Sequence, residues 1–389
     1  CEYWVGLWEC VARSNPQAQT LQAMKGMKTL RSGRNRRKWI YVLLLMGLLG
    51  LSGCGSPSSA SVEMSSQTEL VKTGSMELQY AENFAVDYYE DGYKMLTTLP
   101  DSKRYLLVPE GQPVPKGLDE DVSILQEPLQ NIYLVASGVM DMFASVDAVD
   151  QIRFSGQKQE NWYIQTAKDA MAAGDMIYAG KYSKPDYELL VSEGCDLAIE
   201  NRMITHSPEV VEMLQSFDIP VMIEYSSYEQ HPLGKVEWVK FFGALTGKEA
   251  EAEEAFAEQT EILEKVESGE KTGKTIAFFY VTSNGLIQVR QSTDYIPKLI
   301  ELAGGRYIFE DLEDSGSGRS TLNMQVEDFY AGARDADILI YNSSIDGGVT
   351  TLDELIGKCN ILKDFKAVQE GQVYCTTNDM CYKNCRKYY

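Results

Sequence analysis

Aromatic and cationic residues follow several apolar segments of this chain. The residues of interest are Trp162, Arg202, Tyr225, Tyr228 and Arg290. If the apolar segments are parallel strands, these side chains lie near the carboxyl ends of the strands, where open α/β sheets bind ligands. Aromatic rings supply apolar area and stacking, and arginine clamps carboxylates or catecholates. This set predicts a binding site for a large, partly flat, anionic small molecule.

Other roles remain open for two of these residues, and the two histidines raise a further possibility. Trp162 could instead fix the start of its helix, and Arg290 could pair with Asp294. A site that binds zinc or manganese directly normally uses several histidines, and this chain has only His206 and His231. We therefore predict no metal site. His206 as an axial haem ligand stays open, whereas His231, beside Pro232, is expected to be structural.

Signatures of enzymes are missing from the sequence. It contains no Gly-x-Ser-x-Gly elbow in a strand–turn–helix setting, no phosphate loop and no dinucleotide fingerprint. Cys381 and Cys385 are too loosely spaced for a zinc site, and Cys195 lies in an apolar stretch typical of a core. We expect no enzyme activity and no cofactor, although a glycosidase with paired acids is not excluded.

The charge of the chain excludes nucleic acid as a main partner. The 389 residues carry a net charge of −21, and 44% of them are hydrophobic, as in a folded protein. Residues 1–53 hold eight basic and two acidic side chains. The remainder therefore has 28 basic and 55 acidic residues, a net charge of −27. A basic head on an acidic body is typical of a targeting segment.

The basic head leads into an apolar run that is typical of an export signal. Trp39 to Leu51 are thirteen uncharged residues, too few for a membrane-spanning helix but enough for the core of a signal peptide. The next residues complete Leu51-Ser52-Gly53-Cys54, which looks like a lipobox. We therefore predict lipidation at Cys54 and an anchor on the outer face of the cytoplasmic membrane. Residues 1–23 precede any normal signal peptide and are left out of the fold.

Beyond a flexible Ser- and Gly-rich tether at 54–75, the sequence alternates between strand and helix patterns. Such alternation predicts an α/β fold with mainly parallel sheets covered on both faces. The expected lobes are 76–233 and 270–389. Within 76–108, alternating residues around Glu90-Asp91-Gly92 predict a hairpin. Later strands are expected at 131–136, 152–154, 196–199, 219–223, 275–281, 286–290, 305–309, 337–341 and 372–375. Helices are expected at 139–147, 161–173, 185–193, 208–216, 293–303, 325–333 and 351–357.

The region 234–269 has helical spacing and no strand pattern, so it is expected to link the two Rossmann-like lobes as rigid helix. Gly247 either separates two helices or bends one. The lobes also share a local pattern, in which a helix with an early glutamate precedes a buried strand that opens with aspartate. The two copies are Glu188 with Asp196 and Glu327 with Asp337.

Taken in order, these features resemble the substrate-binding lipoproteins of ABC importers, of the class III type that binds iron-siderophores, haem and cobalamin. The resemblance covers about residues 76–380. It rests on the lipobox at Cys54, the Asp-Gly hairpin, Pro185-Asp186-Tyr187-Glu188, the linking helix, Ile300-Glu301-Leu302-Ala303-Gly304-Gly305 and the unit from Glu327 to Ile340. It implies two lobes with a ligand between them.

The resemblance also implies partners. Proteins of this class dock on an ABC permease through one surface glutamate per lobe, and the matching residues here are Glu188 and Glu327. The plain alternative is that both glutamates only favour the helix dipole. The implied function is capture of an iron complex or cobalamin by a monomeric, membrane-anchored binder. The alternatives are a scaffolding or sensing lipoprotein with the same fold, or a surface-anchored enzyme.

The family usually has a closing helix after the last strand, and the sequence after about 380 has no such pattern, so we expect a truncation or frame change there.

Overall fold

A computed structural model describes residues 70–267, 271–313, 320–343, 345, 349, 351–376 and 386–387. The expected lipidation site at Cys54, the apolar run before it and most of the sequence after 380 lie outside these residues. Among the described residues, no helix has the length and hydropathy needed to cross a bilayer.

The first part of the fold is a five-stranded sheet with the strands in sequence order. All neighbours are antiparallel except β4 and β5, which are parallel. The predicted hairpin is confirmed, with Asp91 and Gly92 both at positive φ in its turn. The tether prediction is wrong at its end, because residues 72–75 pair with β2 as a strand. The strands are β1 (Lys72–Ser75), β2 (Phe84–Tyr89), β3 (Lys94–Thr98), β4 (Lys103–Val108) and β5 (Val122–Gln126).

The first α/β sheet is entirely parallel, in the order β12-β11-β6-β7-β8. Leu197 and Ile199 of β11 pack into one core and Ala198 packs into another, so helices cover both faces. The strands are β6 (Ile132–Leu134), β7 (Ile152–Ser155), β8 (Ile177–Tyr178), β11 (Leu197–Asn201) and β12 (Val221–Glu224). The helices are α3 (Ser137–Ser145), α4 (Gln165–Ala173), α5 (Tyr187–Ser192) and α6 (Pro208–Ser216). A short ribbon of β9 (Gly180–Lys181) and β10 (Lys184–Pro185) precedes α5.

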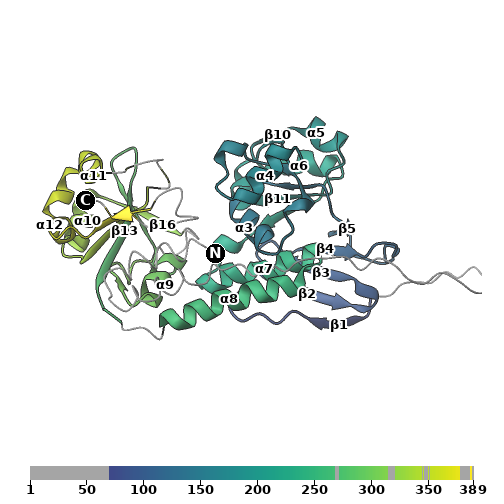
Figure 1. Ribbon diagram of the computed structural model, residues 1–389, viewed down its shortest axis with the longest axis horizontal. Coiled ribbons are helices and arrows are strands. Elements are labelled where there is room, and N and C mark those ends of the chain that lie inside the picture. Colours follow the sequence, from purple (N-terminus) through teal and green to yellow (C-terminus); the bar gives the residue numbers. More distant parts are fainter. Residues whose placement is uncertain are drawn as a thin grey trace, which may run out of the picture.

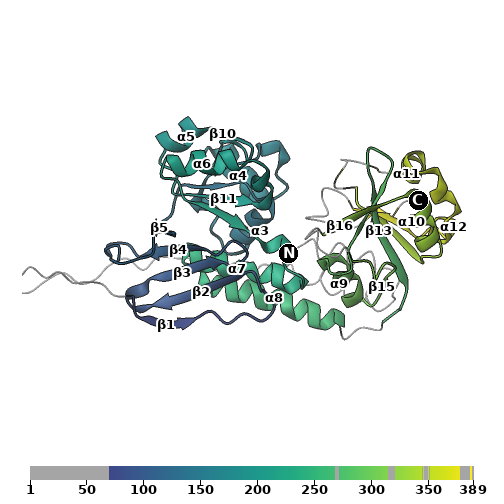
Figure 2. The same ribbon diagram turned by 180° about the vertical axis from the view of Figure 1, so that it is seen from behind.

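The linking region is helical as expected, and Gly247 divides it into two helices that lie side by side, α7 (Pro232–Thr246) and α8 (Glu249–Glu267). Gly247 ends α7 with a positive φ of 68°. Gly243 has no side chain to separate the helices, since a Cβ there would lie 2.5 Å from the Cβ of Ala252. In both views α8 leads from the first lobe toward the second (Figures 1 and 2).

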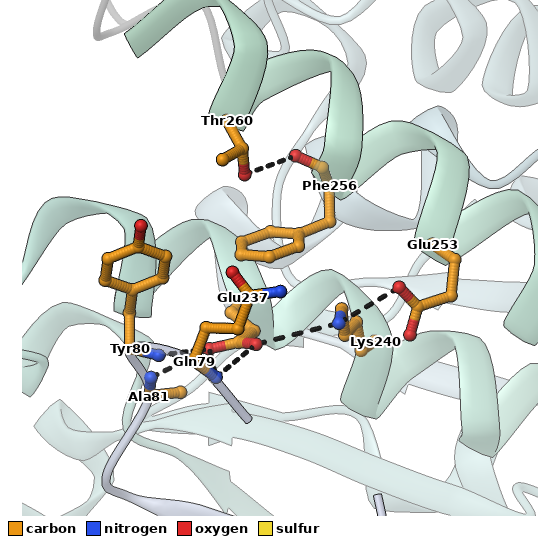
Figure 3. A network of polar contacts seen from close by, with 8 residues as sticks. All are labelled: Gln79, Tyr80, Ala81, Glu237, Lys240, Glu253, Phe256 and Thr260. Atoms are coloured by element: carbon orange, nitrogen blue, oxygen red, sulfur yellow. Dashed lines mark hydrogen bonds and ion pairs between the residues drawn. The ribbon is translucent and has the colours of Figure 1, made fainter. Parts of the chain in front are cut away.

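Two buried glutamates fix the segment before β2 to these helices. The Glu237 carboxylate accepts the backbone N–H groups of Gln79, Tyr80 and Ala81 at 2.8–3.1 Å (Figure 3). Lys240 Nζ lies 3.7 Å from Glu237 and 3.0 Å from Glu253. Glu229 continues the same role for the next two residues, since it accepts the N–H groups of residues 82 and 83 and the indole N–H of Trp238. Five consecutive N–H groups thus find carboxylate acceptors in place of strand partners.

The second lobe is a mixed sheet in the order β16-β14-β13-β17-β18-β19, with β15 also paired to β13. The pairs β13–β17, β17–β18 and β13–β15 are parallel. Its strands are β13 (Thr275–Val281), β14 (Ile287–Arg290), β15 (Arg306–Tyr307), β16 (Thr321–Met324), β17 (Ile338–Tyr341), β18 (Val373–Cys375) and β19 (Arg386–Lys387). Its helices are α9 (Tyr295–Leu302), α10 (Val326–Ala333), α11 (Leu352–Lys358) and α12 (Lys366–Gln369).

The repeated aspartate that opens a strand has the same physical role in both lobes. Asp196, just before β11, accepts the N–H groups of Gln130 and Asn131, which lead into the neighbouring strand β6. Asp337, just before β17, accepts the N–H group of Thr275 at the start of the neighbouring strand β13. Each carboxylate therefore joins the amino-terminal ends of two adjacent parallel strands.

Candidate ligand-binding site at the strand ends

An exposed cation of the first lobe, Arg202, lies where β11 and β12 end. Arg202 begins the 3-10 turn η4 (Arg202–His206), and its guanidinium lies 4.3 Å from the centroid of the Tyr228 ring. Tyr228 ends the next turn, η5 (Ser226–Tyr228), after β12. Both side chains are exposed. A guanidinium stacked on a phenol offers donors and an aromatic surface to the same ligand.

Local hydrogen bonds turn the chain at both strand ends. Asn201 Oδ1 accepts the N–H group of Met203 at 2.8 Å and begins η4. Glu224 Oε2 accepts the N–H group and the hydroxyl of Ser226 at 2.8 and 2.6 Å and begins η5. These capping bonds hold Arg202 and Tyr228 in place, because short polar side chains and carboxylates stabilise such turns.

Tyr225 packs against the ring of Tyr228, on which Arg202 stacks. Its side chain is only 6% exposed, and its ring centroid lies 6.5 Å from that of Tyr228 in an edge-on arrangement. Burial, and then the nearby Asp101 carboxylate, raise the pKa of the Tyr225 hydroxyl, so it stays a neutral donor. Tyr225 therefore positions the Tyr228 ring and offers little surface of its own.

Trp162 does not belong to this surface. It is 1% exposed, packs in the core of the first lobe, and donates its indole N–H to Ser155 Oγ at 3.0 Å. The prediction that its ring faces a ligand is contradicted by this burial. The alternative role holds, since Trp162 fixes the entry to α4.

Arg290 ends β14 in the second lobe, and the alternative predicted for it is confirmed. Its Nη1 lies 3.4 Å from Asp294 Oδ2 and 3.5 Å from Ser320 Oγ. Tyr307 Oη donates to the carbonyl of Arg290 and accepts its N–H group, at 2.8 and 3.1 Å. The guanidinium is thus held in one direction by a buried carboxylate, while its side chain remains 17% exposed.

The helix α7 brings a further cation to the junction of the lobes, which the sequence did not indicate. Lys235 Nζ lies 4.8 Å from the ring centroid of Tyr295, the first residue of α9. Asp294, which pairs with Arg290, caps that same helix through the N–H group of Ile296. A lysine three residues after Pro232 is visible in the sequence, but nothing there links it to the second lobe.

The histidines play unequal parts. His231 caps α7, because its Nδ1 accepts the N–H group of Leu233 at 3.1 Å, and its ring stacks on Tyr80 at 4.6 Å. This confirms a structural role. His206 is exposed at the end of η4. Over the part of the chain that the structure describes, no group of three His, Cys, Asp or Glu side chains is arranged to hold a metal ion.

Glu188 and Glu327 are exposed residues in the first turns of α5 and α10, one in each lobe. Asp186 caps α5 by accepting the N–H group of Leu189 at 3.1 Å. Both side chains are therefore exposed at the start of a helix, and at α5 that start is fixed by a side-chain cap.

Glu200 is an unexpected buried acid near the end of β11. It is 0% exposed, and neither carboxyl oxygen has a hydrogen-bond partner. Burial raises the pKa of the Glu200 carboxyl to about 9. On its face of the sheet lie Ala198 and, in the same core, Tyr133 and Leu190. Glu200 therefore lies inside β11, one residue beyond the strand expected at 196–199.

Two α/β lobes joined by helices, with cations and aromatic rings at the strand ends, define a two-lobed solute-binding protein. Residues 135–380 match the family model described as periplasmic binding protein, and the chain belongs to this family.

Known relatives and structures agree with this assignment. An uncharacterized lipoprotein of Methanocaldococcus jannaschii is 24% identical over 87% of both chains. A second lipoprotein of that organism is 23% identical over 88% of this chain and 90% of its own. The haem-binding protein HutB of Vibrio cholerae aligns with a TM-score of 0.52, 14% identity, and 64% and 90% of the two chains. A protein of an Fe³⁺-hydroxamate transport system from Saccharomonospora viridis aligns with a TM-score of 0.51, 17% identity, and 64% and 86% of the two chains. These two structures share the fold.

Proposed function

We propose that this chain is the solute-binding subunit of an ABC importer and captures an iron complex or a cobalamin between its lobes. The observation that carries the proposal is the exposed guanidinium of Arg202 stacked on Tyr228, at the strand ends of a periplasmic binding protein. Arg290 in the second lobe supplies the opposing cation. Solved proteins of this fold include a haem-binding protein and a protein of an Fe³⁺-hydroxamate system. We favour anionic iron complexes, because two of the residues proposed to bind the ligand are cations.

The ligand class is tested by measuring thermal shifts with haem, cobalamin, ferric siderophores and free metal ions. Saturable stabilisation by one class is expected. For an anionic ligand, replacing Arg202 and Arg290 together with glutamine should weaken binding about tenfold or more, since each loss removes a charge-assisted hydrogen bond. Lys248→Gln, in the turn between α7 and α8, is the control and should leave binding unchanged. Stabilisation by none of these classes would contradict the proposal.

We further propose that the chain is held at the outer face of the membrane through Cys54. The lipobox carries this proposal, and two relatives named lipoproteins support it. A labelled fatty acid should attach to the wild-type chain and not to the Cys54→Ser variant. No labelling of the wild type, or labelling that persists in the variant, would contradict the proposal.

Delivery to the permease is proposed to depend on Glu188 and Glu327. Replacing both with alanine should reduce cellular uptake of the ligand at least fivefold, because two separated carboxylates fix the orientation of docking through charge-assisted contacts. Affinity for the ligand should stay the same, since both glutamates are exposed and neither is among the residues proposed to bind the ligand. The matched control is Glu212→Ala with Glu301→Ala, which removes one exposed carboxylate from each lobe at other helices. Unchanged uptake in the Glu188/Glu327 variant would refute docking through these residues.

A further inference from the structure

Lys235 is placed at the junction of the two lobes. It is the fourth residue of α7, and its side chain is half-buried. Its ammonium faces the ring of Tyr295 at 4.8 Å, and Tyr295 belongs to α9 of the second lobe. α9 packs against both α7 and α8, and Leu302 of α9 joins the core that contains Val239 and Phe256. The lysine therefore reaches from the linking helices to the part of the second lobe that touches them.

Two buried carboxyl groups, one from each lobe, are stabilised by the charge of this ammonium. Asp294 is 8% exposed and Glu224 is 6% exposed. Burial raises the pKa of both carboxyls, and the charge of Lys235 opposes this rise in each case. The same positive charge is thus felt at the end of β12 and at the start of α9.

The helix α7, which carries Lys235, packs against η5, and Lys235 itself contacts the first residue of α9. On one side, Glu224 binds Ser226 in the turn that carries Tyr228, on which Arg202 stacks. On the other side, Asp294 pairs with Arg290. Lys235 is therefore connected through its helix to the turn of Tyr228 and through its ring contact to the helix that Asp294 caps.

We propose that Lys235 is a third cationic binding residue, which contacts the ligand at the lobe junction and selects solutes that carry negative charge. This inference rests on the proposed function and adds to it a residue and a charge preference. A flexible ammonium with three donors suits this place, because it can turn from the Tyr295 ring toward a carboxylate or catecholate oxygen.

The test compares two ferric complexes in the full-length protein. One is a tris-catecholate complex with three negative charges, and the other is a neutral tris-hydroxamate complex. Lys235→Met keeps the apolar stem and should weaken binding of the anionic complex about tenfold, as expected for one lost charged contact. It should change binding of the neutral complex less than twofold. Lys235→Arg should retain most of the affinity, and Lys248→Met should retain all of it.

Three outcomes would overturn the inference, and they are distinguishable from failure of the proposed function. Equal losses for both complexes would mark Lys235 as a structural contact between the lobes. Unchanged affinity of Lys235→Met for the anionic complex would remove it from the site. Wild-type binding of only the neutral complex would leave the proposed function standing and refute the charge preference. If the wild type binds neither these complexes nor the solutes of the wider panel, the proposed function itself fails and the inference fails with it.

Discussion

Replacing Glu237 with glutamine is expected to lower the free energy of unfolding of the first lobe by roughly 3–5 kcal/mol, the usual result of breaking a buried charged network. Glu237 is fully buried and accepts three backbone N–H groups. Glutamine has nearly the same shape, but one oxygen becomes an NH₂ group that faces donors and cannot accept from them. It also leaves Lys240, which is 4% exposed, without its buried counter-charge. Buried N–H groups without acceptors are costly.

Glu253→Gln provides the matched control for this experiment. Glu253 pairs with the same lysine at 3.0 Å, but its side chain is 61% exposed, so its loss should cost less than about 1 kcal/mol. Urea unfolding followed by tryptophan fluorescence reports on the correct lobe, because Trp162 and Trp238 both lie in its core. A difference below about 1 kcal/mol between Glu237→Gln and wild type would show that water or other acceptors satisfy these N–H groups.

The stability of the protein should fall with rising pH because of Glu200. Its folded pKa is about 9, whereas the ordinary value is 4.5. A raised pKa means that the contribution to stability is complete below about pH 4.5 and is lost progressively as the pH rises toward 9. Between pH 5 and pH 8, this single group should lower the free energy of unfolding by roughly 4 kcal/mol, since the unfolded chain releases a proton that the folded chain keeps.

Glu200→Gln isolates this effect, because it keeps the size of the side chain and removes its titration. The free energy of unfolding should be measured for both proteins from pH 5 to pH 8, and the difference between the two curves then cancels all other titrating groups. The groups that face Glu200, Tyr133 in β6 and Tyr187 in α5, are tyrosines whose pKa values are raised by burial, so they stay neutral over this range. If the free energies of unfolding of the wild type and Glu200→Gln change in parallel with pH, then Glu200 is hydrated in solution, contrary to its burial in this structure.

The regular elements could be predicted from sequence because burial on both faces leaves a clear apolar run. Thr275–Val281 was predicted to the residue, and four strands of the first parallel sheet, β6, β7, β11 and β12, were found within a few residues of their ends, whereas the two-residue strand β8 was missed. The irregular strand β16 was missed, since Thr321–Met324 is only half-buried and lacks such a run. β1 was missed for a related reason, because all four of its residues are exposed.

The site could be predicted only in part, because spacing along the chain shows which strand ends a residue follows but not whether its side chain faces outward. Arg202 and Tyr228 do meet at adjacent strand ends. Trp162 follows a strand as well, yet its ring turns into the core to reach Ser155. Lys235 was overlooked, since its aromatic contact comes from the other lobe.

Glu237 shows the same limit within the helix α7. A glutamate in a long helix ordinarily faces water. Here the backbone N–H groups of Gln79, Tyr80 and Ala81, about 157 residues earlier in the chain, donate to this glutamate. Helical periodicity cannot predict such a contact, because it reflects only the spacing of residues within the helix.

The two carboxylates that bind the segment 79–83 also impose an order in time on folding. Each α/β sheet is built from one continuous stretch of chain, so its strands can pair as soon as they are synthesised. The sheet β1–β5 is different, because its approach to the first lobe depends on Glu229 and Glu237, which are made about 150 residues later than the N–H groups they accept. The first strands of the chain should therefore be among the last to dock. In a nascent chain halted before α7, the strands β6 to β12 of the first α/β sheet should already be paired. The sheet β1–β5 would not yet be docked, because Glu237, which accepts the N–H groups of its leading segment, has not been synthesised.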